Sequence, residues 1–462
     1  MKFPLLGKTL AVGGVLVALT LALQSVSAIV SEREGRLREA ESSVADSLAS
    51  QQVLVGPVLL RRCDESWTTE QGEGKDRKLV TERRDFTLAA TPATLDVSAK
   101  AVLETRHRGI FQVNGYNMHA LMKARWADLA VLEPSAQHAG GKLHCEPSTM
   151  FVAVGDARGI RVATITAGGA ALPVLPGTEH LSHPRGFHAV LPAALQAAGG
   201  VLQAEVALDL VGTGDLSFAP VADTTHVALT SDWPHPSFAG RFLPNTHEIG
   251  PQGFRADWQL SALATTAPQE LLDRSNVCAS NGRAEGKLHC IETFGVAFMD
   301  PVSSYVLSDR ATKYGLLFIA LTFVGVGLVE VLKRLRVHPV QYLLVGSAIA
   351  VFFLLLVSLT EHIAFAWAYL AASAACTLLL AFYASFVLHG ARAGAVFGAA
   401  MAALYGALYL LLQLEQSALV LGSLLLFAVI GAVMVATRRV DWYALMDRLR
   451  REAAPPAATP AQ

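Results

Sequence analysis

Charged residues are scarce in this chain, at 16% of 462 residues, and between residues 314 and 436 they are almost absent. This scarcity excludes a water-exposed domain there, because surfaces in contact with water carry polar and charged side chains. The stretch is instead divided into apolar runs of about 20 residues, the length at which a helix crosses a bilayer. One more such run lies at residues 10–30, so the sequence predicts an integral membrane protein.

Six apolar runs are predicted to cross the membrane, at residues 10–30, 314–332, 341–359, 363–388, 394–413 and 418–436. Basic residues gather in alternate connections: between residues 333 and 336, at Arg392 and after residue 437. The other two turns carry Glu361 and Glu415 and no Lys or Arg. Because Lys and Arg remain on the cytoplasmic side, both termini are predicted in the cytoplasm and residues 31–313 outside it, in the periplasm if the source is a Gram-negative bacterium.

The amino end has an alternative reading. Val26-Ser27-Ala28 has the small-residue pattern that a signal peptidase cleaves. The apolar run before it is longer than the apolar core of a signal peptide, which favours an uncleaved anchor. Either alternative leaves the polar region outside the cytoplasm.

The polar region after the first span is predicted to be mostly β-sheet. A stalk helix is expected first, over residues 31–55 and ending at Gly56-Pro57, because apolar residues recur at intervals of three and four: Leu37, Ala40, Val44 and Leu48. Residues 64–78 are charged and without periodicity, which indicates a surface loop. Beyond them, short runs rich in β-branched and aromatic residues, separated by Gly, Pro, Asn and Asp, indicate strands in two packed layers.

The predicted fold class is an α+β membrane protein with a six-helix transmembrane bundle and a large β-rich periplasmic domain. Its predicted parts are an anchor at residues 1–30, an amphipathic stalk at 31–55, the β-rich domain at 56–312, a five-helix bundle at 313–437 and a basic cytoplasmic tail at 438–462. A short internal repeat, Gly-Lys-Leu-His-Cys at residues 141–145 and again at 286–290, raises the hypothesis of two related β units.

Only five cysteines occur, and four of them fall in the region predicted to be periplasmic. In an oxidising compartment they favour disulfides, and the expected pairs are Cys63–Cys145 and Cys278–Cys290. Four cysteines allow three pairings, and buried reduced thiols are the alternative. Cys376 lies alone in the fourth span.

Catalytic and cofactor signatures are missing. The sequence has no phosphate loop, dinucleotide fingerprint, zincin motif or Cys-x-x-Cys spacing, so no cofactor, metal or nucleic acid is expected. His180, His183 and His188 have ligand-like spacing, but Pro184 and Gly186 between them exclude a single helix that would present them together. Acids in the membrane half lie at the ends of spans, which disfavours an ion-coupled transporter without excluding one.

The chain resembles the CreD family of inner-membrane proteins over almost its whole length. In the membrane half the resemblance is carried by Asp300-Pro301-Val302, Arg310-Ala311, Lys313-Tyr314, Glu330, His338-Pro339, Gln341-Tyr342 and Glu361-His362. In the external region it is carried by Gly56-Pro57, Arg108-Gly109-Ile110-Phe111, Asp156-Ala157-Arg158-Gly159-Ile160 and Ser231-Asp232-Trp233-Pro234. Thr360 and Ser303-Ser304 depart from the family pattern, and the family does not support the disulfides.

The resemblance implies a role in cell envelope integrity and in the response to envelope stress, and it brings no reaction, ligand or catalytic residue. Residues that carry it are expected to meet where the external region enters the bilayer, as a candidate functional junction: Asp300, Arg310, Lys313, Glu361 and His362. Two functions are compatible with this junction. One is a non-enzymatic envelope factor, anchored in the lipid bilayer, whose β-rich domain binds periplasmic protein, lipid or peptidoglycan. The other is a membrane-surface enzyme or a lipid-handling or transport protein, which requires an open polar cleft at the junction.

Overall fold

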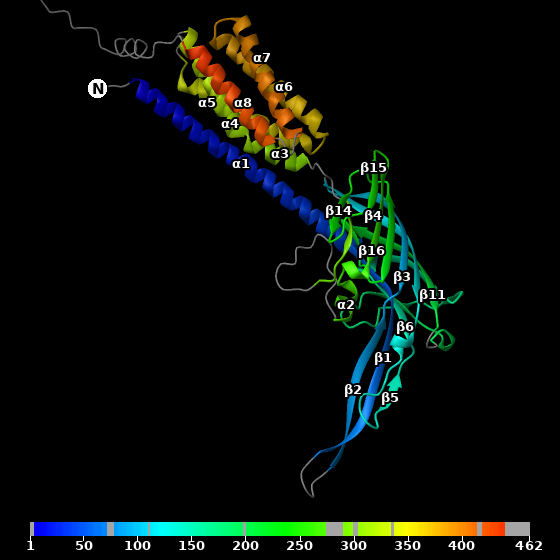
Figure 1. Ribbon diagram of the computed structural model, residues 1–462. Helices are drawn as coiled ribbons and strands as arrows, with labels where there is room; N and C mark the ends of the chain where they lie inside the picture. The colour runs from blue at the N-terminus through cyan, green and yellow to red at the C-terminus, as the bar shows by residue number, and fades with distance from the viewer. Residues whose placement is uncertain are drawn as a thin grey trace, which may run out of the picture. The chain divides into compact units, whose positions relative to one another are not determined.

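The computed structural model describes residues 4–71, 78–109, 111–196, 200–273, 290–298, 304–333, 337–413 and 418–438. The chain divides into two compact units (Figure 1). A helical unit consists of Met1–Leu37 and Val302–Gln462, and a β unit consists of Arg38–Pro301. The predicted combination of apolar helices and a large β-rich region is therefore confirmed.

The helical unit contains the apolar segments predicted from the sequence. Its helices are α1 (Pro4–Ser47, whose last residues belong to the β unit), α3 (Ser304–Lys313), α4 (Gly315–Lys333), α5 (Pro339–Thr360), α6 (Phe365–Val387), α7 (Ala391–Gln413) and α8 (Ala418–Thr437). In the described part of the chain, α1, α5, α6 and α7 are long and apolar enough to cross a membrane. Helices α3 and α4 meet at a bend of 42° and give a fifth span if they are counted together. The number of six spans stays a prediction.

Helix α3 was not expected. The sequence analysis placed residues 304–312 at the end of the β-rich domain, whereas the structure folds them as a helix of the helical unit that packs against α4, α5 and α7. Its residues mix charged with apolar side chains, so they lack the long apolar run by which the spans were recognised. Arg310 and Lys313 therefore lie on a short helix.

The β unit is built from two large sheets. Within the described residues, a nine-stranded sheet has the order β14-β17-β12-β1-β6-β10-β9, with β2 and β5 also paired to β1, and an eight-stranded sheet has the order β15-β16-β13-β3-β4-β11-β7-β8. The strands of the first are β1 (Gln52–Gln71), β2 (Lys78–Ala90), β5 (Lys142–Cys145), β6 (Thr149–Ala153), β9 (Leu175–Pro176), β10 (Gly186–Val190), β12 (Asp215–Phe218), β14 (Ser237–Gly240) and β17 (Phe294–Ala297). Those of the second are β3 (Thr94–Arg108), β4 (Phe111–Trp126), β7 (Ile160–Ala167), β8 (Ala170–Leu172), β11 (Leu202–Thr213), β13 (Thr224–Ser231), β15 (Thr246–Gly250) and β16 (Gly253–Ser261). The short helix α2 (Ala267–Leu272) follows β16.

Alternation of buried and exposed residues explains why these segments form strands. In β3 and β13 every second side chain enters the core while its neighbours face outward. The largest buried rings satisfy their polar atoms internally. Trp126 donates its indole N–H to the carbonyl of Ala90 (3.0 Å), and the Tyr116 hydroxyl donates to that of Asp215 (2.8 Å). Burial without these bonds would leave unpaired polar atoms in the core.

The loop predicted at residues 64–78 is wrong over most of its length. Strands β1 and β2 form a long antiparallel hairpin in which Asp64 faces Asp85 and Gln71 faces Lys78 (Figure 1). Beyond the residues paired with β5 and β6, this part of β1 pairs only with β2, and its described side chains are partly or fully exposed. Hydrophobic alternation is not required in such a hairpin, so the sequence carried no strand signal there.

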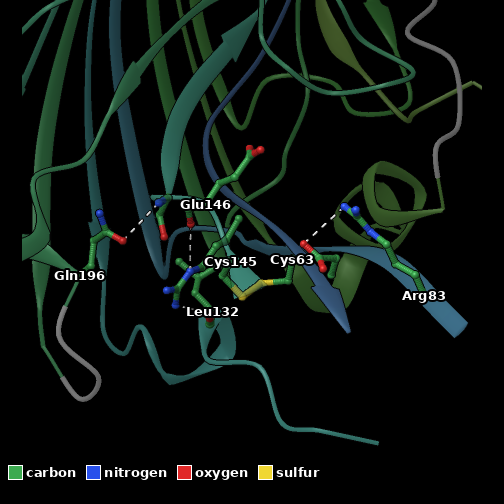
Figure 2. Close-up of a disulfide and its surroundings, with 9 residues drawn as sticks. Cys63, Arg83, Leu132, Cys145, Glu146 and Gln196 are labelled. Atoms are coloured by element: carbon green, nitrogen blue, oxygen red, sulfur yellow. Dashed lines mark hydrogen bonds and ion pairs between the residues drawn. A yellow bond between two sulfur atoms is a disulfide. The ribbon is translucent and has the colours of Figure 1, made fainter. Parts of the chain in front are cut away.

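A disulfide joins Cys63 of β1 to Cys145 of β5, the pair chosen from the sequence (Figure 2). The two residues lie directly opposite each other in the antiparallel ladder. Nearby, Arg61 donates to the carbonyls of Leu132 (3.0 Å) and Glu146 (3.3 Å), which fixes the segment between β4 and β5. Cys290 is also disulfide-bonded. Cys278 lies outside the described residues, as does most of the second copy of the repeat, so the pair Cys278–Cys290 and the two related β units stay predictions.

Helix α1 ends at Ser47, whereas the stalk was expected to continue to residue 55. The Arg158 guanidinium donates to the carbonyl of Asp46 in the last turn, and the Asp156 carboxylate accepts from the backbone N–H of Ser50 (3.0 Å). The first of these bonds satisfies a carbonyl that the C-terminal end of a helix leaves free, and the second fixes the chain that follows. Gly56-Pro57, which was expected to end the helix, instead lies inside β1 at a shift in its register with β6.

A histidine-rich segment precedes β10. His183 is buried at 5% exposure, and its Nε2 has no hydrogen-bond partner in the structure. The His180 ring stacks on it with 4.8 Å between centroids, while Nδ1 of His188 bonds the carbonyl of Gly177 at 2.7 Å. Among the described residues no three His, Cys, Asp or Glu side chains are arranged to hold a metal. The stacked rings of His180 and His183 and the bonded His188 thus take part in the packing of this segment.

Acid is expected to destabilise this segment. Burial, with the neighbouring His180, lowers the pKa of His183 to about 4 from 6.5. The folded protein binds the proton less well than the unfolded chain, so the stability that neutral His183 provides is complete above pH 6.5 and falls as the pH drops toward 4. At about 1.4 kcal/mol per pKa unit, the loss reaches at most about 3 kcal/mol. Denaturant unfolding of the full chain in detergent at several pH values measures it.

The matched variants are His183→Gln and His226→Gln, the second at a more exposed site beside Asp96. His183→Gln is expected to flatten the pH dependence between pH 6.5 and 4, and His226→Gln to leave it unchanged. An equal slope in the wild-type and His183→Gln proteins would contradict the assignment.

Candidate functional site

One face of α1 forms an apolar seam in the helical unit. Its buried residues are Leu19, Leu23, Val26 and Val30, at intervals of four, three and four, which places them on one side of a helix. They join a core cluster that includes residues of α4 and α5. Glycines make room for them: a Cβ added at Gly346 would overlap Leu19.

An ion pair closes this seam at one end. Nε of Arg33 lies 3.2 Å from Oε1 of Glu361, the residue that caps the C-terminus of α5. The Glu361 side chain is only 12% exposed, and that of Arg33 is 37% exposed. Tyr305 of α3 lies within electrostatic range of both charges. Arg33 and Glu361 are called the Arg33 pair below.

A second charged group closes the seam at the other end. Lys8 of α1 pairs with Glu330 of α4, which also accepts a hydrogen bond from the hydroxyl of Tyr342 of α5 (3.0 Å). The backbone N–H of Val337 approaches the same carboxylate at 3.4 Å. The Lys8 cluster, meaning Lys8, Glu330 and Tyr342, therefore links α1 to both α4 and α5.

The spacing of the two groups fits a membrane. Lys8 and Arg33 are 25 residues apart on one continuous helix, which corresponds to a rise of about 37 Å. The hydrocarbon core of a bilayer is about 30 Å thick, and about 40–45 Å with its headgroup layers. Charges at this separation are at the depth of the two interfaces, where a charged side chain costs least.

The structure describes four of the five residues of the predicted junction, and the junction itself stays a prediction. Glu361 is in the Arg33 pair, and His362 follows it with an exposed side chain. Lys313 is exposed at the end of α3 and pairs with Asp309 one turn earlier (2.6 Å). Arg310 is half-buried in the same helix. Asp300 lies outside the described residues.

Arg33 was missed by the sequence analysis, although a signal for it was present. Residues 19, 23, 26 and 30 are followed at the next interval by 33, and preceded on the same face by 15, 12 and 8. A basic residue at each end of one apolar face indicates a helix that forms an ion pair with an acidic residue at each end. Arg33 falls within residues 31–55, which are predicted as an amphipathic stalk, so the prediction does not assign it to the apolar face of the span before it.

This geometry is suited to anchoring. The carboxylate of Glu361 is paired with the guanidinium of Arg33, and that of Glu330 is bonded by both Lys8 and Tyr342. What the arrangement does is fix α1 to the ends of α4 and α5.

Reversing the charge of Arg33 is expected to destabilise the helical unit. In Arg33→Glu the nearly buried Glu361 loses its partner and faces a like charge, at a cost of about 1–3 kcal/mol. The double variant Arg33→Glu with Glu361→Arg restores opposite charges and should recover most of the loss. Thermal unfolding of the purified protein in detergent measures both effects.

Arg36→Glu is the matched control, because Arg36 is exposed and pairs with Glu32 within the same helix (2.8 Å). It should cost well under 1 kcal/mol, as exposed pairs do. A double variant no more stable than Arg33→Glu alone would show that the pair does not hold α1.

Comparison with known proteins assigns the chain to a family. The model of the family "Inner membrane protein CreD" matches residues 4–443. Inner membrane protein CreD of Escherichia coli (strain K12) is 34% identical over 445 residues, which are 96% of this chain and 95% of that protein. The match thus covers the helical unit as well as the β unit. The chain belongs to the CreD family of inner membrane proteins.

Proposed function

We propose that this protein contributes to the integrity of the bacterial cell envelope and to the response to envelope stress without catalysing a reaction. Its β-rich unit binds an envelope component (protein, lipid or peptidoglycan) while the helices hold it in the inner membrane. The observation that carries this proposal is the Arg33 pair. The carboxylate expected at an open polar junction is nearly buried and already neutralised by a residue of α1.

The β unit supports a binding role through its form. The hairpin of β1 and β2 offers a long two-stranded surface whose charged side chains pair with one another, as Arg83 does with Asp64 and Asp85. Its register with β5 is held by the disulfide. A preformed surface of this kind binds a partner without first being ordered.

The proposed topology has six spans, with both termini in the cytoplasm and the β unit in the periplasm. It is supported by the positions of Lys and Arg in the connections between spans. It is also supported by the Lys8 cluster and the Arg33 pair, which lie a membrane thickness apart. The turn between α5 and α6 is then periplasmic, and the turn between α6 and α7 is cytoplasmic.

Cysteine labelling in intact cells tests this topology. A membrane-impermeant maleimide should label His362→Cys from outside and Gly390→Cys only after the inner membrane is opened. His362 is exposed after α5, and Gly390 lies between α6 and α7. Labelling of Gly390→Cys in cells with an intact inner membrane would overturn the topology.

Exchanging the two charges of the Arg33 pair tests whether this pair anchors α1 or takes part in catalysis. In cells lacking the protein, survival under detergent or β-lactam stress is expected to fall and to recover with the wild-type chain. The double variant Arg33→Glu with Glu361→Arg should also protect, because it keeps the pair while moving the carboxylate to α1. Protection and membrane abundance are measured together. Normal abundance without protection would favour a chemical role for Glu361, and full survival without the protein would contradict the envelope role.

A further inference from the structure

Helices α6 and α7 pack closely at one end and separate at the other. At the close end, a Cβ added at Gly394 would lie 2.6 Å from the Cβ of Ser385, and one added at Gly398 would lie 2.7 Å from that of Ala381. These glycines let the two helices approach, as a GxxxG pair does. At the other end, the rings of Tyr369 and Tyr409 stand between the helices with 5.2 Å between centroids.

The separation leaves a groove of about 690 Å³ between α6 and α7. Its size is that of sites that hold small ligands, roughly 300–1,000 Å³. The lining is almost wholly apolar, with Tyr369 and Tyr405 at its base. One wall includes Gly406, where an added Cβ would meet no atom within 4 Å. The groove is therefore open along the wall that α7 provides.

The hydroxyl groups at the base of the groove are already engaged. The Tyr369 hydroxyl donates to the carbonyl of Tyr405 (2.7 Å), and the Tyr405 hydroxyl donates to Sγ of Cys376 (3.2 Å). The Ser373 hydroxyl donates to the carbonyl of Leu370 in its own helix (3.1 Å). With these groups satisfied, the groove offers a ligand contact with hydrocarbon and aromatic surface.

The length of the groove indicates what fits it. On α6 it extends from Ala366, at the start of the helix, to Leu378, a rise of about 18 Å. One leaflet of a bilayer contributes about 15 Å of hydrocarbon, half of the 30 Å core. The groove thus has about the length of one acyl chain, and the contacts of Gly394 and Gly398 with α6 close it toward the other leaflet.

Trp367 marks the mouth of the groove. It lies in the first turn of α6 and is 67% exposed, and Trp is enriched at the depth of lipid headgroups. We propose that this groove holds one acyl chain of a membrane lipid from the leaflet in which α6 begins, with the lipid headgroup beside Trp367. This site goes beyond the proposed envelope role, which does not require it.

Photolabelling in a defined bilayer tests the groove. The full chain is reconstituted into vesicles of phosphatidylethanolamine and phosphatidylglycerol that contain a trace of phosphatidylethanolamine with a diazirine in its acyl chain. After irradiation, mass spectrometry is expected to find adducts concentrated in residues 366–378 and 402–409. An even distribution over the lipid-exposed faces of α6, α7 and α8 would overturn the proposal.

Filling the groove should displace the lipid. Gly406→Phe is expected to lower the adduct in these two segments by about fivefold, which corresponds to about 1 kcal/mol. Ala374→Trp should do the same from the α6 wall, and it serves as a second variant if the first does not fold. Gly431→Phe is the matched control, because an added Cβ at Gly431 in α8 also meets no atom within 4 Å.

Three results would overturn the proposal. The first is unchanged labelling in both groove variants when they are folded, and the second is an equal loss in Gly431→Phe. The third is crosslinking of the groove segments to a second copy of the chain in place of lipid, which would assign the groove to self-association.

Discussion

A charge near a bilayer needs a partner, and the helical unit meets this requirement at both ends of α1. The apolar seam from Leu19 to Val30 stabilises the packing of α1, but it only weakly determines the position of α1 along its own axis, because one apolar turn resembles the next. The Arg33 pair and the Lys8 cluster fix that position. Sliding α1 by one turn would leave two cations and two acids without partners, and such groups are costly in a membrane environment. The register of α1 against α4 and α5 is thus set by ionic contacts, while its adhesion comes from the glycine-lined apolar face.

The β unit uses a comparable device where α1 ends. Asp156 is 6% exposed and accepts bonds from Ser50 and from Arg158, which in turn bonds the last carbonyls of the helix. The Arg158 guanidinium holds the pKa of the Asp156 carboxyl well below its usual range. A buried carboxylate with several donors holds its segment in one geometry, since each unmade bond would leave an uncompensated charge. The side chains of Asp156 and Arg158 therefore position both the end of α1 and the start of β1.

Much of the architecture follows from local patterns in the sequence. Apolar runs predicted α4 to α8 closely, and short alternating segments predicted the β-rich region, because both patterns are read within a window of one element. The predictions that failed concern segments whose structure depends on residues distant in the sequence. Residues 64–71 form a strand because β2 pairs with them, and the charged face of α1 finds its partner more than 300 residues later. The pair Cys63–Cys145 was chosen correctly, but sequence alone allowed other pairings.

The order of strands in the nine-stranded sheet has a consequence for how the chain is made. β1 is the first strand synthesised, yet its parallel neighbour β12 begins at Asp215, and the next strand, β17, ends at Ala297 just before the C-terminal helices start. Strand β2 pairs with most of this edge of β1 soon after it is made, but residues 52–54 at the start of β1 stay unpaired on that edge while more than 150 residues emerge, and contacts of such long range form slowly. An open strand edge is a template for pairing with the wrong chain. The start of β1 is thus the part of this strand that stays available for mispairing until β12 has been made.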